Sequence, residues 1–170
     1  MSLKQATGLD FIINPYSSED PLSFRQHFVM FLVTNSYLRI VNNIYFNFDA
    51  AEKLYQKRFG FNDQPLQDYI DCIKELSNIT AGKTKHFFEE FGIQLEHSLP
   101  IQMAPYNEIY VLEYYQNFET QYVTLEVDGI NLLCSTFVHV AQEHQTQVDK
   151  FEKEFDLSLA EKEIYEIEVF

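Results

Sequence analysis

The longest periodic pattern in the chain lies between residues 65 and 91. Apolar residues recur there at spacings of three and four, the period of an α-helix that buries one face. The series consists of Leu66, Tyr69, Ile70, Ile73, Leu76, Thr80, Phe87 and Phe88. Pro65 suits the first turn of a helix, and Gly92 is a typical helix stop. The pattern therefore predicts one long helix that begins after Pro65 and ends near Phe91.

The opposite face of this expected helix is a polar stripe. Its members are Asp71, Glu75, Asn78, Gly82, Lys85 and Glu89, at spacings of four, three, four, three and four. Asn78 is a poor helix former, because its side chain favours caps and turns. Gly82 costs about 1 kcal/mol relative to alanine in the middle of a helix. An exposed helix face that contains both of these unfavourable residues suggests a binding surface for a partner.

Most of the remaining chain has the pattern of strands and turns. Strands are expected at residues 27–33, at 37–48, which Asn42-Asn43 could interrupt, and at 107–115, 119–127 and 130–138. A period of two also starts at Ile93. Asn35-Ser36 and Asp128-Gly129 are turn signals, the second typical of a tight hairpin.

A second helix and the two ends of the chain complete the pattern. Asp49 is in position to cap a helix from Ala50 to about Arg58, which Gly60 would end. Residues 1–22 are expected to form an irregular arm, with Phe11 to Ile13 against the core. Residues 141–156 have the pattern of a helix, and residues 157–170 end in the pattern of a strand.

Composition and charge narrow the class of protein. A chain of 170 residues with 46% hydrophobic and 22% charged residues is expected to fold as a single domain, residues 1–170. Its 16 Phe and 11 Tyr favour strands and a large core. The net charge of −14 argues against nucleic acid and against an anionic membrane surface as partners. Residues 141–170 hold nine acidic and three basic residues and form an acidic C-terminal extension.

The cysteines and the N-terminus bear on the compartment. Cys72 and Cys134 both sit in apolar runs, so we expect buried free thiols, with neither a disulfide framework nor a metal site. The N-terminal residues contain no long apolar stretch, so no signal peptide or membrane span is expected. The expected location is the cytoplasm.

Two apparent motifs do not meet the requirements of their chemistry. Gly82-Lys83-Thr84 ends like a phosphate-binding loop, but that loop needs a glycine where Ser77 stands, and this segment is expected to be helical. His139 and His144 flank a glutamate, but they are five residues apart, whereas a zinc-binding helix needs histidines four apart.

The polar stripe carries a more specific pattern. Asp71-x-x-x-Glu75-x-x-Asn78, followed by Pro100, resembles the signature of the CheC/CheX family of chemotaxis phosphatases. The text from Glu75 to Lys83 is similar to the family's helix sequence, and the segment 43–60 also fits. The likeness covers about residues 28–138. One departure is that 21 residues separate Asn78 from Pro100, where the family pattern usually has 22. A single copy of the motif makes the chain more similar to CheX than to CheC.

The resemblance implies a fold and an activity. The expected fold class is α+β: a CheC-like α/β sandwich, in which a mostly antiparallel sheet packs against long helices, with a β-rich C-terminal half. The implied activity is hydrolysis of the phospho-aspartate of a CheY-like response regulator. Asn78 would hold the attacking water and Glu75 would pair with a lysine of the regulator. Asp71 would help docking, and we assign Gly82 to the same partner surface.

The resemblance also implies what the chain does not need. It would have no cofactor of its own, since Mg²⁺ comes with the phosphorylated regulator, and it could pair as a homodimer. The alternative is a non-catalytic CheC-like module that binds a receiver domain or a component of the flagellar switch. The sequence leaves this choice open.

Overall fold

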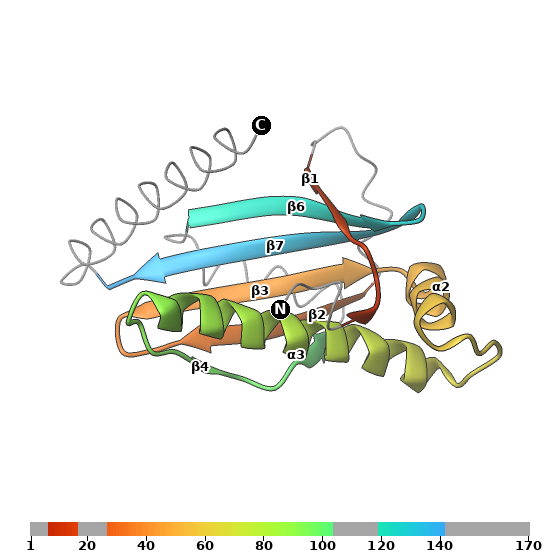
Figure 1. The fold of residues 1–170 in the computed structure, drawn as a ribbon, viewed down its shortest axis with the longest axis horizontal. Helices are drawn as coiled ribbons and strands as arrows, with labels where there is room; N and C mark the ends of the chain where they lie inside the picture. Colours follow the sequence, from red (N-terminus) through yellow and green to blue (C-terminus); the bar gives the residue numbers. More distant parts are fainter. Residues whose placement is uncertain (1–6, 17–26, 104–118, 142–170) are drawn as a thin grey trace, which may run out of the picture.

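The computed structural model describes residues 7–16, 27–103 and 119–141, and these form one antiparallel sheet with two helices (Figure 1). The elements in chain order are β1 (Ile12–Pro15), β2 (His27–Thr34), β3 (Leu38–Phe46), α2 (Phe48–Phe59), α3 (Leu66–Glu90), β4 (Glu96–His97), β5 (Ile101–Met103), β6 (Glu119–Val127) and β7 (Ile130–Val140). The seven strands are ordered β1-β6-β7-β3-β2-β4, and β5 also pairs with β2.

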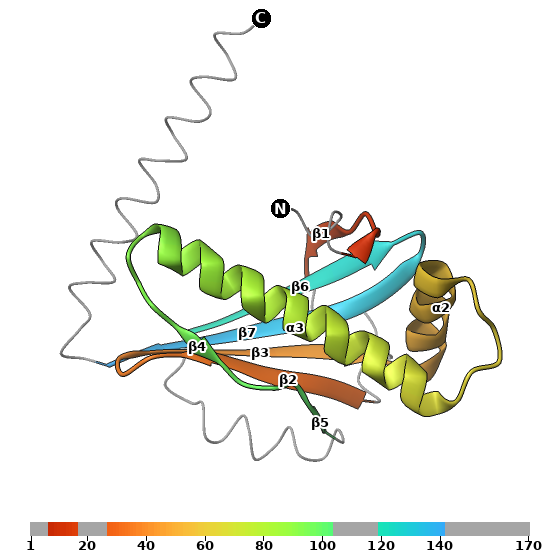
Figure 2. The same cartoon turned by 60° about the horizontal axis from the view of Figure 1, so that its bottom comes forward.

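The long helix α3 lies across one face of the sheet (Figures 1 and 2). It packs mainly against β2 and α2, through an inner face that includes Ile73 and Leu76. Ile73 is fully buried, and burying such a side chain contributes about 1.5–3 kcal/mol. Leu66 and Phe87 of the series are exposed, whereas Phe88 is partly buried and packs against the core. The fully buried face therefore occupies the middle of the helix, opposite the polar stripe.

The expected helix boundaries are close to the observed ones. Helix α3 has Pro65 at its N-cap position and ends at Glu90, and Gly92 follows in the left-handed conformation at φ 77°. Asp49 as the cap of α2 is wrong: α2 begins one residue before it, and Asn47 is the cap. The Oδ1 atom of Asn47 accepts a 2.7 Å hydrogen bond from the N–H of Ala50.

Replacing Asn47 by alanine should lower the free energy of unfolding by about 1 kcal/mol, because the Ala50 N–H loses its acceptor. Asp49→Ala is the matched control. Its exposed pair with Lys53 typically contributes about 0–1 kcal/mol. Urea unfolding of both variants checks this, and an equal or larger loss in Asp49→Ala would contradict the assignment of the cap.

Strand β3 is continuous, so the interruption considered at Asn42-Asn43 does not occur. The side chains of both residues make hydrogen bonds across the sheet. Thr136 Oγ1 donates to Asn42 Oδ1 at 2.9 Å, and Asn43 Nδ2 donates to Ser135 Oγ of β7 at 3.3 Å. These bonds offset part of the cost of burying amides in a strand, since Asn42 Nδ2 and Asn43 Oδ1 have no partner among the described residues. The Asp128-Gly129 hairpin turn is confirmed, with both residues at positive φ.

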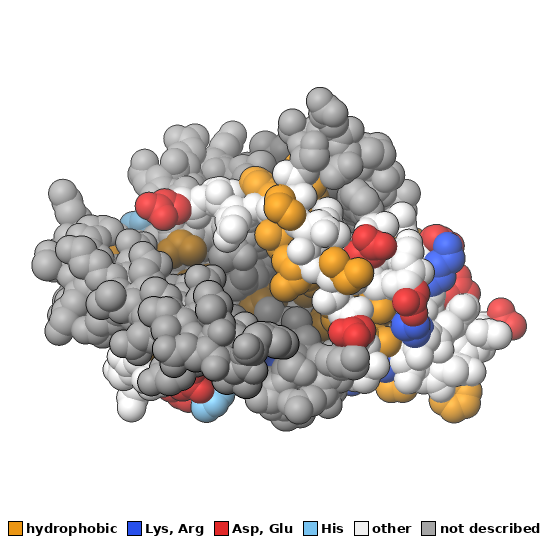
Figure 3. All heavy atoms as spheres, turned by 45° about the horizontal axis from the view of Figure 1, so that its top comes forward, with side chains coloured by type: hydrophobic (Ala, Val, Ile, Leu, Met, Phe, Trp, Pro, Cys, Tyr) orange, Lys and Arg blue, Asp and Glu red, His pale blue; other side chains and the backbone are white. Residues whose placement is uncertain are grey.

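The N-terminal expectation is wrong in part. Residues 12–15 form strand β1, which pairs with β6 in antiparallel register. Ile12 and Ile13 are 59% and 61% exposed, and only Phe11 of this trio packs against the core. Apolar side chains reach the surface over this part of the molecule in the view of Figure 3. The strand expected at 107–115 and both elements expected beyond residue 141 lie outside the described residues.

The fold class is confirmed as α+β with an antiparallel sheet, and the described residues contain one long helix and one shorter helix where long helices were expected. Helix α3 has 25 residues and α2 has 12. No helix in the described part of the chain is long and apolar enough to cross a membrane.

Candidate functional site

The polar stripe of α3 is an outward-facing surface of the fold. Asp71, Glu75 and Gly82 are exposed, and Asn78 is half-buried between them. The neighbouring Ser77 and Ala81 face inward and are buried, so this part of the helix is packed against the rest of the fold on its inner side. The sequence pattern alone placed these four candidate residues on one face, and the structure puts them there.

The side chains of Glu75 and Asn78 are not engaged within the fold. Neither the carboxylate nor the amide has a hydrogen-bond or ion-pair partner in the described part of the chain. The two residues lie three apart on one helix, so their side chains project from neighbouring positions. A free carboxylate and a free amide, held at fixed spacing by a rigid helix, are available to a partner molecule.

Asp71 differs from Glu75 because its carboxylate is already paired. Lys74 Nζ lies 3.1 Å from Asp71 Oδ1, and Gln67 Nε2 donates to the same oxygen at 2.9 Å. These hydrogen bonds from Lys74 and Gln67 hold the pKa of Asp71 below its usual value. A carboxylate with its own lysine is less able to take a second cation than the unpaired carboxylate of Glu75.

Gly82 has open space beside it. A Cβ atom built on this residue meets no atom of another described element within 4 Å. The helix therefore does not need a glycine here for internal packing. The Gly82-Lys83-Thr84 segment lies inside α3, and Thr84 Oγ1 donates to Thr80 O at 3.0 Å. Since its N–H groups are used within the helix, the segment cannot form a phosphate-binding loop.

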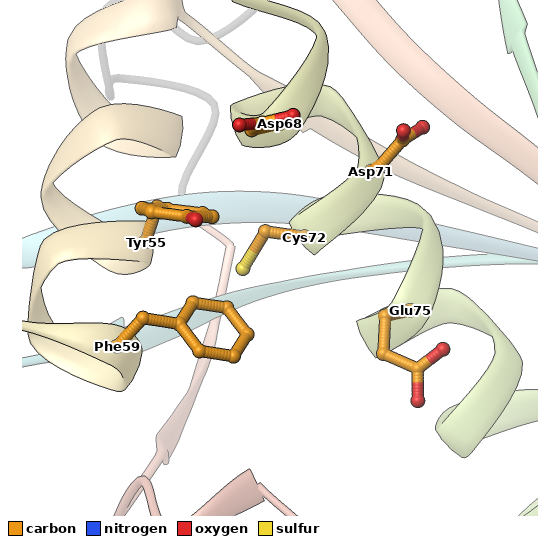
Figure 4. A pocket seen from close by; sticks show the side chains of 6 residues that line it. All are labelled: Tyr55, Phe59, Asp68, Asp71, Cys72 and Glu75. Atoms are coloured by element: carbon orange, nitrogen blue, oxygen red, sulfur yellow. The ribbon is translucent and has the colours of Figure 1, made fainter. Parts of the chain in front are cut away.

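A groove separates α3 from α2 next to Glu75 (Figure 4). It has a volume of about 350 Å³ and is lined by Tyr55, Phe59, Asp68, Asp71, Cys72 and Glu75. Tyr55 and Phe59 come from α2, and their ring centroids lie 4.7 Å apart. The other four come from α3, so the groove adjoins the polar stripe along one side.

Sequence reasoning missed Tyr55, Phe59 and Asp68 as parts of a site. Their proximity to Glu75 depends on the packing of α2 against α3, which no local pattern reports. The only local pattern that involves Asp68 is its position as an acidic residue in the first turn of the long helix. That position is explained by a favourable interaction with the helix dipole, so it did not point to a site.

Both cysteines are free thiols; Cys72 is buried, as expected, and Cys134 is half-buried. Burial raises the pKa of Cys72, and it raises the pKa of Cys134 to about 12. Neither thiol is therefore a nucleophile near neutral pH. In the described ranges, no group of three or more His, Cys, Asp or Glu residues is arranged to hold a metal ion.

Comparison with solved structures identifies the fold. The chain superimposes on CheX from Vibrio vulnificus with a TM-score of 0.59 and 14% identity, over 81% of this chain and 88% of that one. A CheC-like protein from a Shewanella species gives a TM-score of 0.63 and 12% identity, over 81% and 89%. CheX in a complex with CheY, BeF₃ and Mg²⁺ from Borrelia burgdorferi gives 0.58 and 10%, over 82% and 91%.

No protein-family model and no curated protein matches the chain. At such low identities the structural likeness establishes the fold, which is that of the CheC and CheX chemotaxis proteins. The expectation drawn from the Asp71–Asn78 pattern is confirmed at that level.

Proposed function

We propose that this chain, whose fold is that of the CheC and CheX chemotaxis proteins, is a phosphatase that hydrolyses the phospho-aspartate of a CheY-like response regulator. The observation that carries the proposal is the pair Glu75 and Asn78 on the outward face of α3, whose side chains have no partner among the described residues. The complex of CheX with CheY, BeF₃ and Mg²⁺ from Borrelia burgdorferi supports a receiver domain as the partner of this fold.

The main requirement of the reaction is a water molecule held in position for attack, because no covalent intermediate with the phosphatase is needed. The water oxygen attacks phosphorus, the bond to the aspartyl oxygen breaks, and the products are inorganic phosphate and a free aspartate. Such phosphoryl transfer is catalysed mainly by positioning and by stabilising charge. The regulator supplies Mg²⁺ on the phosphoryl group. The amide of Asn78 offers both a donor and an acceptor, which suits it to orient a water for attack.

Glu75 would hold the regulator in register. Its exposed carboxylate lies one turn before Asn78 and has no cation of its own among the described residues. A lysine of the regulator would form a charge-assisted hydrogen bond with it. Asp71 and Gly82 would belong to the surrounding contact surface. We propose that the reaction takes place in the cytoplasm. A homodimer in which two copies pair through their sheets stays a prediction.

The direct test is to mix the protein with a response regulator phosphorylated by a small-molecule phosphodonor and to measure phosphate release. Release should be faster than autodephosphorylation and should require Mg²⁺. Binding of the regulator without faster release would contradict the phosphatase and would favour the non-catalytic binding module.

Glu75→Ala should weaken engagement of the phosphorylated regulator, with little change in stability. An exposed carboxylate typically contributes about 0–1 kcal/mol to folding, and alanine favours the helix. The matched control is Glu90→Ala, which removes an exposed carboxylate in the last turn of the same helix. Kinetics at varied regulator concentration and a thermal melt check both parts. Unchanged kinetics together with a sharp loss of stability would make Glu75 a structural residue.

A further inference from the structure

The groove between α2 and α3 has two kinds of wall. Its α2 side is aromatic, with Tyr55 and Phe59, and Phe59 is 44% exposed. Its α3 side carries Asp68, Asp71, Cys72 and Glu75; the Cys72 thiol points toward the rings, and the Asp71 carboxylate points away from them (Figure 4). Such a groove offers ring faces to the stem of a side chain and negative charge to its end.

The carboxylates at the rim are only partly neutralised by the protein itself. Asp71 is paired with Lys74, but Asp68 and Glu75 have no ion-pair partner in the described ranges. Arg58 is the other cation nearby. Its guanidinium lies over the Phe59 ring, 5.0 Å from the centroid, and it also interacts with the thiol of Cys72 in the groove wall. Arg58 forms no ion pair with Asp68 or Glu75 in the described ranges, so these two carboxylates stay without a salt-bridge partner.

The chemistry of the walls selects the occupant. A purely apolar side chain would cover Asp68 and Glu75 without giving them a partner, which is costly. An acidic side chain would be repelled. A lysine or arginine can lay its aliphatic stem on Tyr55 and Phe59 and bring its charge to the rim. Cations are also attracted to aromatic ring faces, as Arg58 already is.

We propose that the groove between α2 and α3 receives a lysine or arginine side chain of the response regulator. Glu75 belongs both to this groove and to the site beside Asn78. The groove cation is therefore a second one, held by Tyr55, Phe59 and Asp68, in addition to the lysine that would pair with Glu75. The inference rests on the proposed function for the identity of the partner. It makes Tyr55, Phe59 and Asp68 residues that determine which regulator binds, because only a regulator with a cation at this position gains the contact.

The test measures binding, which does not depend on hydrolysis. The probe is the regulator activated with BeF₃⁻ and Mg²⁺, titrated into the wild-type chain and two variants by calorimetry. Asp68→Lys reverses the charge at the groove. Glu119→Lys makes the same change of charge at an exposed position at the start of β6, outside the groove. Thermal melts establish that both variants are folded.

Asp68→Lys should raise Kd roughly tenfold, and Glu119→Lys should leave it nearly unchanged. Asp68→Asn, which keeps the size of the side chain, should give a smaller rise and a weaker dependence of Kd on salt. Alanine replacement of the lysines and arginines of the regulator should identify one whose effect disappears in the Asp68→Asn background.

Equal effects of Asp68→Lys and Glu119→Lys on Kd would refute the proposed cation site in the groove, because they would show a general effect of net charge. Absence of any coupled cation on the regulator would also overturn it. Binding that depends on Asp68 without phosphate release would support the cation site in the groove and refute the phosphatase activity. Phosphate release with no dependence of binding on Asp68 would support the phosphatase activity and refute the cation site. A chain that binds no receiver domain would refute both.

Discussion

Asn78→Ala should remove most of the phosphatase activity while the protein stays folded. Loss of one fixed hydrogen-bonding group from an active site typically costs about a hundredfold or more in kcat, and we expect that magnitude here. The physical reason is that alanine can neither donate to nor accept from the attacking water. Phosphate release from a phosphorylated regulator under saturating conditions is the measurement.

Stability separates this role from a structural one. The Asn78 amide makes no hydrogen bond in the described part of the chain, so its removal leaves no buried group unpaired. Alanine is also the better helix former, by at most about 0.7 kcal/mol. The melting temperature should therefore hold or rise. The control Asn62→Ala removes an exposed asparagine from the loop before α3 and should keep full activity. A kcat near that of the wild type in Asn78→Ala would end the water-positioning hypothesis.

Gly82→Leu should block dephosphorylation and leave the protein at least as stable as the wild type. The open space around this residue means that a new side chain meets solvent and not the core. Replacing a helical glycine by a good helix former should stabilise the helix by up to about 1 kcal/mol. A regulator that brings its phospho-aspartate to Asn78 would, however, collide with a leucine one turn further along the same face.

Gly82→Ala separates the two effects of this substitution. It gives the same gain in helix propensity with a side chain of one carbon, so its stability should rise and its activity should fall less than that of Gly82→Leu. Melting temperatures and phosphate release of both variants check the expectation. A clear fall in the melting temperature of Gly82→Leu, or full activity in that variant, would contradict a partner surface at Gly82.

Local periodicity determined several elements of this fold without help from the structure. The apolar series from Tyr69 to Leu76 repeats every three to four residues, and only one face of a helix can satisfy it. Strand β6 coincides with the expected residues 119–127. Asp128-Gly129 adopts the tight turn that its residue types favour. In each case the information lies within a few residues, which is why the sequence was enough.

Tertiary contacts decided the elements that local patterns missed. Ile12 to Pro15 do not alternate, and they become a strand because their backbone pairs with β6 more than a hundred residues later. Asn42 and Asn43 have turn-forming side chains, yet β3 continues through its pairing with β7, where Thr136 and Ser135 hydrogen-bond the two side chains. Such long-range pairing has no local signature, since either partner alone is compatible with several conformations.

The candidate site also has features that the sequence determined and features that only the tertiary structure decided. The sequence by itself determined that Asp71, Glu75, Asn78 and Gly82 share one helix face, because the helical period alone places them there. Only the tertiary structure decided that Glu75 and Asn78 find no partner, and Gly82 no close neighbour, among the residues that the structure describes. It also decided that α2 brings two aromatic rings beside the carboxylates of α3. Helical spacing acts over one or two turns, whereas the groove exists only after two helices have packed together.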